Sequence, residues 1–170
     1  MQRDAFTRWL DVHRPDLRPV VYQPGAMLGA APIGWQLTLG RTRIVYRVPP
    51  DHPDIFYIVL IERGAGPRTL HSPFGDLVRL LLLVQRSQAG IRWIRGHVQP
   101  TARGPADALP AARILAFYQR YLTTVSDGVE NGVAWYGGDL TTFSWAAEKT
   151  KVRRVTPPGR VAQKQDHPNR

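Results

Sequence analysis

Three segments of the chain carry hydrophobic residues at the spacing of an α-helix. The clearest is the segment 72–90, where Ser72 can cap the first turn and Gly90 can end the last one. Its buried stripe is expected to consist of Leu77, Leu80, Leu81 and Val84. A short helix after the cap residue Asp4 and another over about 110–122 show the same period. The pattern therefore predicts about three helices.

Between the first two helices, hydrophobic and polar residues alternate with a period of two. The segments 35–39 and 44–48 alternate on either side of a tight turn, which predicts a hairpin with Arg43 and Arg47 pointing outward. The run 55–61, IFYIVLI, has no polar interruption. Such a run is typical of a strand at the centre of a sheet, or of one covered on both faces.

Shorter strand patterns complete the reading of the chain, over 20–22, 91–98, 132–136 and 139–145. A turn is predicted at Asp127-Gly128, ahead of the last two of these strands. Strands joined by hairpin-type links and interleaved with helices predict an α+β fold on a mostly antiparallel sheet. The apolar pattern stops near Lys149. We therefore expect a single domain over 1–148 and a flexible basic tail over 149–170.

Composition adds a strong positive charge. The 170 residues include 23 Lys and Arg against 13 Asp and Glu, a formal net charge of +10. Half of that excess lies in 148–170, and every basic residue before this segment is arginine. Arginine enrichment can reflect the base composition of the genome, or it can serve recognition of carboxylates and phosphates. The charge makes an acidic partner plausible, either a nucleic acid or a protein.

Residue chemistry offers no catalytic, cofactor or metal site. The chain has no cysteine, no Gly-x-Ser-x-Gly elbow and no phosphate-binding Gly-Lys-Ser/Thr loop. Gly64-Ala65-Gly66 lacks the third glycine of a dinucleotide loop, and no two of the five histidines are three or four residues apart. The sequence thus predicts that the protein is not an enzyme and binds no cofactor or metal.

The hydropathy of the chain predicts its compartment. No apolar run approaches eighteen residues, and the first residues lack the apolar core of a signal peptide. We expect a cytoplasmic protein without membrane insertion.

The five tryptophans suggest candidate interaction residues. Trp9, Trp35 and Trp93 are expected to pack in the core. The other two lie beside glycines and the basic tail, where an exposed aromatic residue can anchor an interface or stack on bases. The candidate interaction residues are therefore Trp135, Trp145, Lys149, Lys151, Arg153 and Arg154.

The order of segments resembles the LcrR-type regulators of bacterial type III secretion. The likeness lies in the helix with Trp9 and Leu10, the strand pair WQLTLGRTRIVYRV, the strand YIVLIER, the helix start SPFGDL, the helix RILAFYQRY and the turn Asn131-Gly132. It covers roughly residues 5–136. The resemblance implies a small cytoplasmic, non-enzymatic protein that helps to control expression and export of secretion components, and it brings no catalytic residues with it.

Three functional hypotheses follow, and the last of them, an enzyme of unrecognised type, would need carboxylates and histidines that the fold brings together. The first is a regulatory adaptor that binds a secretion-system protein with an acidic surface, in a chaperone-like role or in control of the gatekeeper and needle-tip components. The alternative is a nucleic-acid-binding regulator that uses the basic tail as a phosphate-contacting arm.

Overall fold

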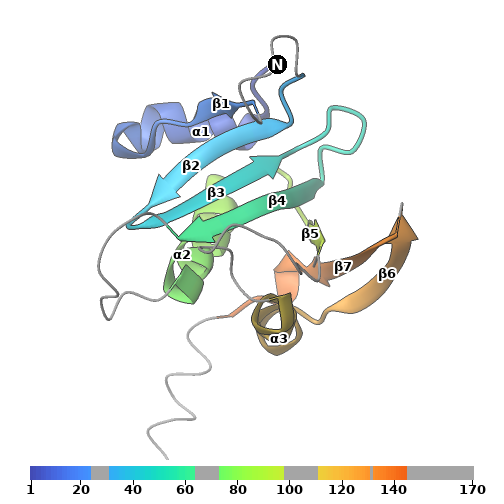
Figure 1. Cartoon of the computed structure of the whole chain (residues 1–170). Helices are drawn as coiled ribbons and strands as arrows, with labels where there is room; N and C mark the ends of the chain where they lie inside the picture. The colour runs from blue at the N-terminus through green and yellow to red at the C-terminus, as the bar shows by residue number, and fades with distance from the viewer. Residues whose placement is uncertain (24–30, 64–72, 98–110, 131, 145–170) are drawn as a thin grey trace, which may run out of the picture.

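The computed structural model describes residues 1–23, 31–63, 73–97, 111–130 and 132–144 (Figure 1). Within them lie three α-helices, α1 (Ala5–His13), α2 (Pro73–Ser87) and α3 (Ala111–Tyr121). Two short 3-10 helices follow α1 and the last strand, at Pro15–Leu17 and Leu140–Thr142. The predicted helices are confirmed, and Asp4 caps α1 by accepting a hydrogen bond from the Thr7 backbone nitrogen at 2.9 Å.

The strands form one sheet of seven in the order β1-β2-β3-β4-β5-β7-β6. They are β1 (Val20–Tyr22), β2 (Gly34–Leu39), β3 (Thr42–Arg47), β4 (Ile55–Arg63), β5 (Trp93–His97), β6 (Val125–Glu130) and β7 (Val133–Asp139). Every neighbouring pair is antiparallel except β4 and β5, which are parallel because α2 connects them. The α+β class and the central position of the IFYIVLI run are confirmed.

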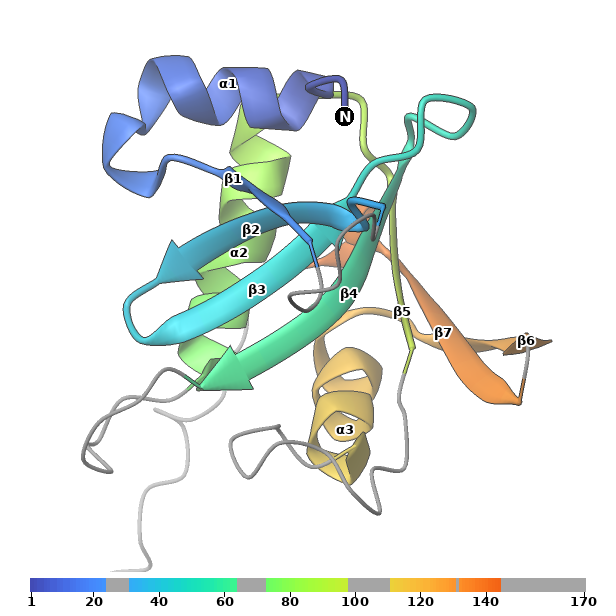
Figure 2. The ribbon, with the colours of Figure 1, turned by 45° about the horizontal axis from the view of Figure 1, so that its top comes forward.

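The three helices cover one face of the sheet, and in Figure 2 α2 runs behind β2, β3 and β4. On α1, the Phe6 ring lies 5.5 Å from the rings of both Tyr46 and Phe56. On α3, Tyr118 packs so closely on β5 that a Cβ added at Gly96 would lie 2.6 Å from its hydroxyl. The opposite face carries no helix in the described part of the chain.

A bulge in β4 keeps its hydrophobic residues on the core side. Ile44 pairs with Ile61 and Tyr46 with Ile58, so that β4 uses one more residue than β3 over this stretch. The extra residue is Val59. Because side chains alternate along a strand, this insertion brings both isoleucines to the buried face although three positions separate them.

The C-terminal strands differ from the expectation. Asp127-Gly128 lies inside β6, where the positive φ of Gly128 (98°) accompanies a register shift, and the chain turns at Gly132 instead (φ 75°). The strand β7 continues through Gly137-Gly138 to Asp139, and Leu140–Thr142 form a 3-10 helix, so the strand predicted over 139–145 is not observed. A Cβ at Gly138 would meet Leu122, the residue after α3, at 2.6 Å, so β7 packs closely against the end of this helix. The predicted tail, 149–170, lies outside the described residues.

Candidate functional site

Of the predicted interaction residues, Trp135 is the one that the structure describes. It lies on β7, on the face of the sheet opposite the helices, and is half-buried. The others, Trp145, Lys149, Lys151, Arg153 and Arg154, lie outside the described residues. The surroundings of Trp135 can therefore be examined, while its role in an interaction stays a prediction.

Trp135 contributes to a cluster around Arg95 that spans four strands. The guanidinium carbon of Arg95 lies 4.9 Å from the centre of the Trp135 ring and 5.5 Å from that of Tyr57. Arg95 also donates hydrogen bonds to the Tyr57 hydroxyl at 3.1 Å, to Glu130 at 2.7 Å and to the carboxylate of Asp127. These partners lie on β4, β7 and β6, so Arg95 connects the edge strand β6 to the centre of the sheet.

The guanidinium of Arg95 is in contact with two carboxylates and two aromatic rings. Only 17% of its side chain is exposed. Burial acts to lower the pKa of Arg95, but the hydrogen bonds to Glu130, Tyr57 and Asp127 outweigh burial and leave its pKa raised. A guanidinium held by two carboxylates and two rings stabilises the sheet and is not available to a ligand.

His97 lies two residues further along β5, with its ring centre 5.1 Å from that of Trp135. Burial lowers the pKa of His97, so the ring is neutral near pH 7. Its Nδ1 is buried and makes no hydrogen bond to any described residue. In the described ranges, no group of three or more His, Cys, Asp or Glu residues lies close enough together to hold a metal ion.

A shallow hollow of about 400 Å³ lies beside Arg95 on the same face. It forms where Gly137 leaves β7 without a side chain, between Ile55 and Val125. Trp93 borders it with 41% of its surface exposed, so the expectation that this tryptophan packs in the core is wrong. The reason is the strand alternation: Ile94 takes the buried face of β5, and Trp93 therefore points to the other face.

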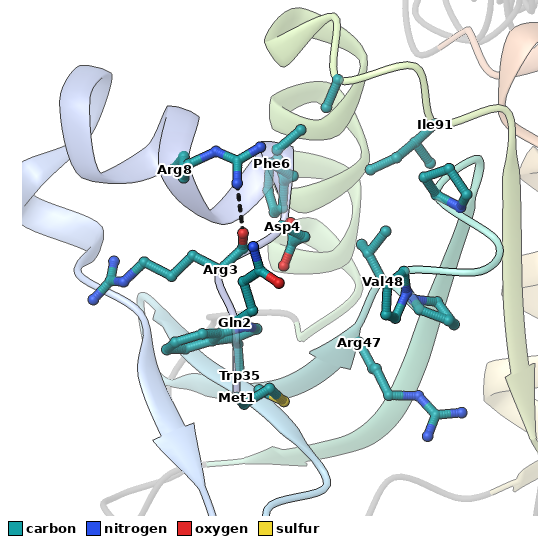
Figure 3. Close-up of a pocket in the computed structure, with 15 residues that line it drawn as sticks. Met1, Gln2, Arg3, Asp4, Phe6, Arg8, Trp35, Arg47, Val48 and Ile91 are labelled. Atoms are coloured by element: carbon teal, nitrogen blue, oxygen red, sulfur yellow. Dashed lines mark hydrogen bonds between the residues drawn. The ribbon is translucent and has the colours of Figure 1, made fainter.

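A second hollow, of about 410 Å³, lies where the start of α1 meets the end of β3 (Figure 3). We call it the α1–β3 pocket. Its apolar lining includes Phe6 of α1, Trp35 of β2 and Ile91 of the link between α2 and β5. The segment after β3 adds Val48, Pro49, Pro50 and Pro53.

Three arginines and one aspartate line the α1–β3 pocket. Arg3 lies 5.1 Å from the Trp35 ring and pairs with Asp11, which is outside the pocket. Arg8 donates a hydrogen bond to the backbone carbonyl of Arg3 at 2.7 Å (Figure 3). Arg47 lies above the ring of Tyr57, 5.4 Å from its centre. Neither Arg8 nor Arg47 pairs with a carboxylate in the part of the chain that the structure describes.

Asp4 is the acidic residue in the lining, and its oxygens are already in use. They accept hydrogen bonds from the Thr7 backbone nitrogen at 2.9 Å and from the Thr7 hydroxyl at 2.6 Å. The pocket is thus mainly apolar with a cationic rim. The sequence pattern placed Arg47 outward, as observed, but carried no signal for the pocket because its walls come from distant segments.

None of the helices in the described ranges combines the length and hydropathy needed to cross a bilayer.

Comparison with solved structures gives a likeness to the crystal structure of the acetyltransferase of the GNAT family from Streptococcus pneumoniae. The TM-score is 0.39 and the sequence identity 17%, over 66% of this chain and 63% of the length of that chain. Comparison with curated proteins gives no match.

Comparison with protein families gives a match over most of the chain. The model of the type III secretion system regulator (LcrR) family matches residues 3–143. This range contains all of the helices and strands described above. The resemblance found in the segment order is therefore confirmed, and the chain belongs to the LcrR family of type III secretion system regulators.

Proposed function

We propose that this protein is a non-enzymatic, cytoplasmic regulator that acts by binding an acidic protein component of the type III secretion system. Family membership indicates that the protein acts in type III secretion, and the positive surface charge supports binding of an acidic protein. Within the described ranges, no group of three or more His, Cys, Asp or Glu residues is placed to hold a metal ion.

One observation carries the proposal. Seven arginines make no ion pair with a carboxylate in the described ranges, and all of them are at least partly exposed. They are Arg8, Arg18, Arg47, Arg63, Arg86, Arg92 and Arg113. A guanidinium presents a planar fork of donors that matches a carboxylate in two parallel hydrogen bonds. Such a surface steers an acidic partner into contact and favours it over neutral competitors.

The test is an affinity capture of the tagged full chain from its native host. The lysate is treated with nuclease and held at about twice physiological salt, where contacts to phosphate weaken steeply. We expect a discrete secretion-system protein at near-stoichiometric yield, identified by mass spectrometry. A bait that recovers no secretion component under these conditions contradicts the proposal.

The alternative, a nucleic-acid-binding regulator, rests on the charge of the C-terminal segment. Residues 148–170 carry seven basic and two acidic residues. Recovery of nucleic acid alone, and only at low salt without nuclease, would favour this alternative.

A further inference from the structure

The α1–β3 pocket combines an apolar wall with arginine side chains in its lining. Its wall after β3 is made of Val48, Pro49, Pro50 and Pro53, and Ile91 lies close by. Prolines bring no N–H group and hold a fixed backbone, so this wall is both apolar and preformed. A hollow of about 410 Å³ is within the range of sites that bind small ligands or anchoring side chains.

Arg8 and Arg47 also line this hollow, and they come from different elements. Arg8 comes from α1 and Arg47 from the end of β3, and Figure 3 shows them on opposite sides of the hollow. Neither is neutralised by a carboxylate of a described residue, whereas Arg3 is held by Asp11. The complementary ligand therefore carries an apolar group flanked by negative charges.

The same features favour a protein segment over a nucleic acid. Stacking of a base needs an exposed aromatic face. The aromatic rings of the pocket, Phe6 and Trp35, are 0% and 5% exposed, and Arg3 lies over Trp35. An aliphatic side chain, in contrast, packs against proline, valine and isoleucine without displacing any ring.

We infer that the α1–β3 pocket docks a short acidic segment of a partner protein, with one apolar side chain against Val48 and Ile91 and carboxylates on Arg8 and Arg47. This inference rests on the proposed function and names the surface and the chemistry that the partner must match. The apolar side chain of the partner anchors the segment in the pocket, and the arginines set the orientation of the segment.

The first test uses a defined probe, the peptide acetyl-Asp-Leu-Asp-amide, titrated to millimolar concentration into the isotope-labelled full chain. NMR follows the backbone amides of Val48 and Ile91 and the indole N–H of Trp35. We expect saturable shifts at these residues, and none with acetyl-Asn-Leu-Asn-amide or acetyl-Asp-Gly-Asp-amide. Absence of shifts at the pocket, or equal shifts with the asparagine peptide, overturns the inference.

Matched variants separate the pocket from general charge. Arg8→Gln with Arg47→Gln removes two pocket arginines, and Arg18→Gln with Arg113→Gln removes two that do not line it. We expect the first pair to weaken peptide binding about tenfold and the second to change it less than about twofold. Equal effects of the two pairs overturn the inference.

The same variants, used as baits in the affinity capture, distinguish the proposed function from the proposed site. A partner that disappears with the pocket pair and is kept with the control pair supports both the function and the site. A partner that is kept by both pairs leaves the proposed function intact and overturns the pocket. If the wild-type bait captures no partner, the function fails and the peptide titration still decides whether the pocket binds acidic segments.

Discussion

The guanidinium carbon of Arg95 lies 4.9 Å from the centre of the Trp135 ring, on the face of the sheet that carries no described helix. On its other side Arg95 contacts Tyr57, and its nitrogens reach Asp127 and Glu130 on β6. All six residues of β6 are exposed, so the strand buries almost nothing of its own. The attachment of β6 therefore depends on its ladder with β7 and on Arg95.

Replacing Arg95 with methionine is expected to lower the free energy of unfolding by about 2 kcal/mol. The variant removes a cation–π interaction with two rings and leaves two carboxylates without a partner, although their exposure limits the cost. Urea denaturation measures the loss, and amide hydrogen exchange should show faster opening of β6 than of β2 and β3. Arg47→Met is the control, because Arg47 contacts the same Tyr57 ring without an ion pair; equal losses would contradict the role given to Arg95.

Gly137 and Gly138 are neighbours on β7 with opposite tolerance of a side chain. A Cβ at Gly138 would lie 2.6 Å from the Cβ of Leu122, the residue that follows α3. Leu122 could relieve this clash only if the end of α3 shifted. A Cβ at Gly137 meets nothing closer than 3.7 Å. We expect Gly138→Ala to cost about 1–3 kcal/mol and Gly137→Ala to be nearly neutral. Thermal denaturation of the two variants, side by side, tests this, and a reversed order would contradict the packing of α3 on β7.

The local pattern was sufficient for most of the elements. The hydrophobic stripes of the helices, the hairpin around Gly40 and the uninterrupted run of β4 each depend on near neighbours in sequence, and they are observed as predicted. The α+β class follows from their order. In these regions local preference and tertiary packing agree.

The misses share a physical cause: the deciding contact is distant in the sequence. Trp93 looked like a core residue by type, but the pairing of β5 with β4 and β7 directs it outward. Gly128 was predicted to lie in a turn, but in the structure its positive φ accompanies a register shift within β6. The α1–β3 pocket joins segments from four parts of the chain, and no periodicity in any one of them indicates it.

Acid should destabilise the protein through His97. Burial lowers the pKa of its ring below the ordinary value of 6.5. As the pH falls below 6.5, the unfolded chain binds a proton that the folded chain does not, so stability is lost until the pH reaches the lowered folded-state pKa. Above 6.5 both states are neutral and the contribution is complete.

The measurement is the melting temperature of the wild type and of His97→Leu from about pH 7.5 to about pH 5. We expect the wild type to lose more stability over this range than the variant. His52→Leu serves as the control, since 60% of the His52 side chain is exposed. Parallel curves for the wild type and His97→Leu would show that His97 does not contribute.

Deleting residues 149–170 tests both the predicted domain boundary and the alternative function. The deletion removes seven basic residues and one acidic residue, and the expected domain, 1–148, remains whole. We expect an unchanged melting temperature, because the apolar pattern ends before the cut.

The same deletion tests DNA binding. If the segment binds phosphates, the affinity for a short DNA duplex should fall. The slope of the logarithm of the binding constant against the logarithm of the salt concentration should become shallower by about 0.9 for each phosphate that the truncated chain no longer neutralises. Replacing Lys149, Lys151, Arg153 and Arg154 with glutamine at full length separates charge from chain length. DNA binding that survives both changes with the same salt slope would contradict the phosphate-contacting arm, and a lowered melting temperature would place the domain boundary beyond residue 148.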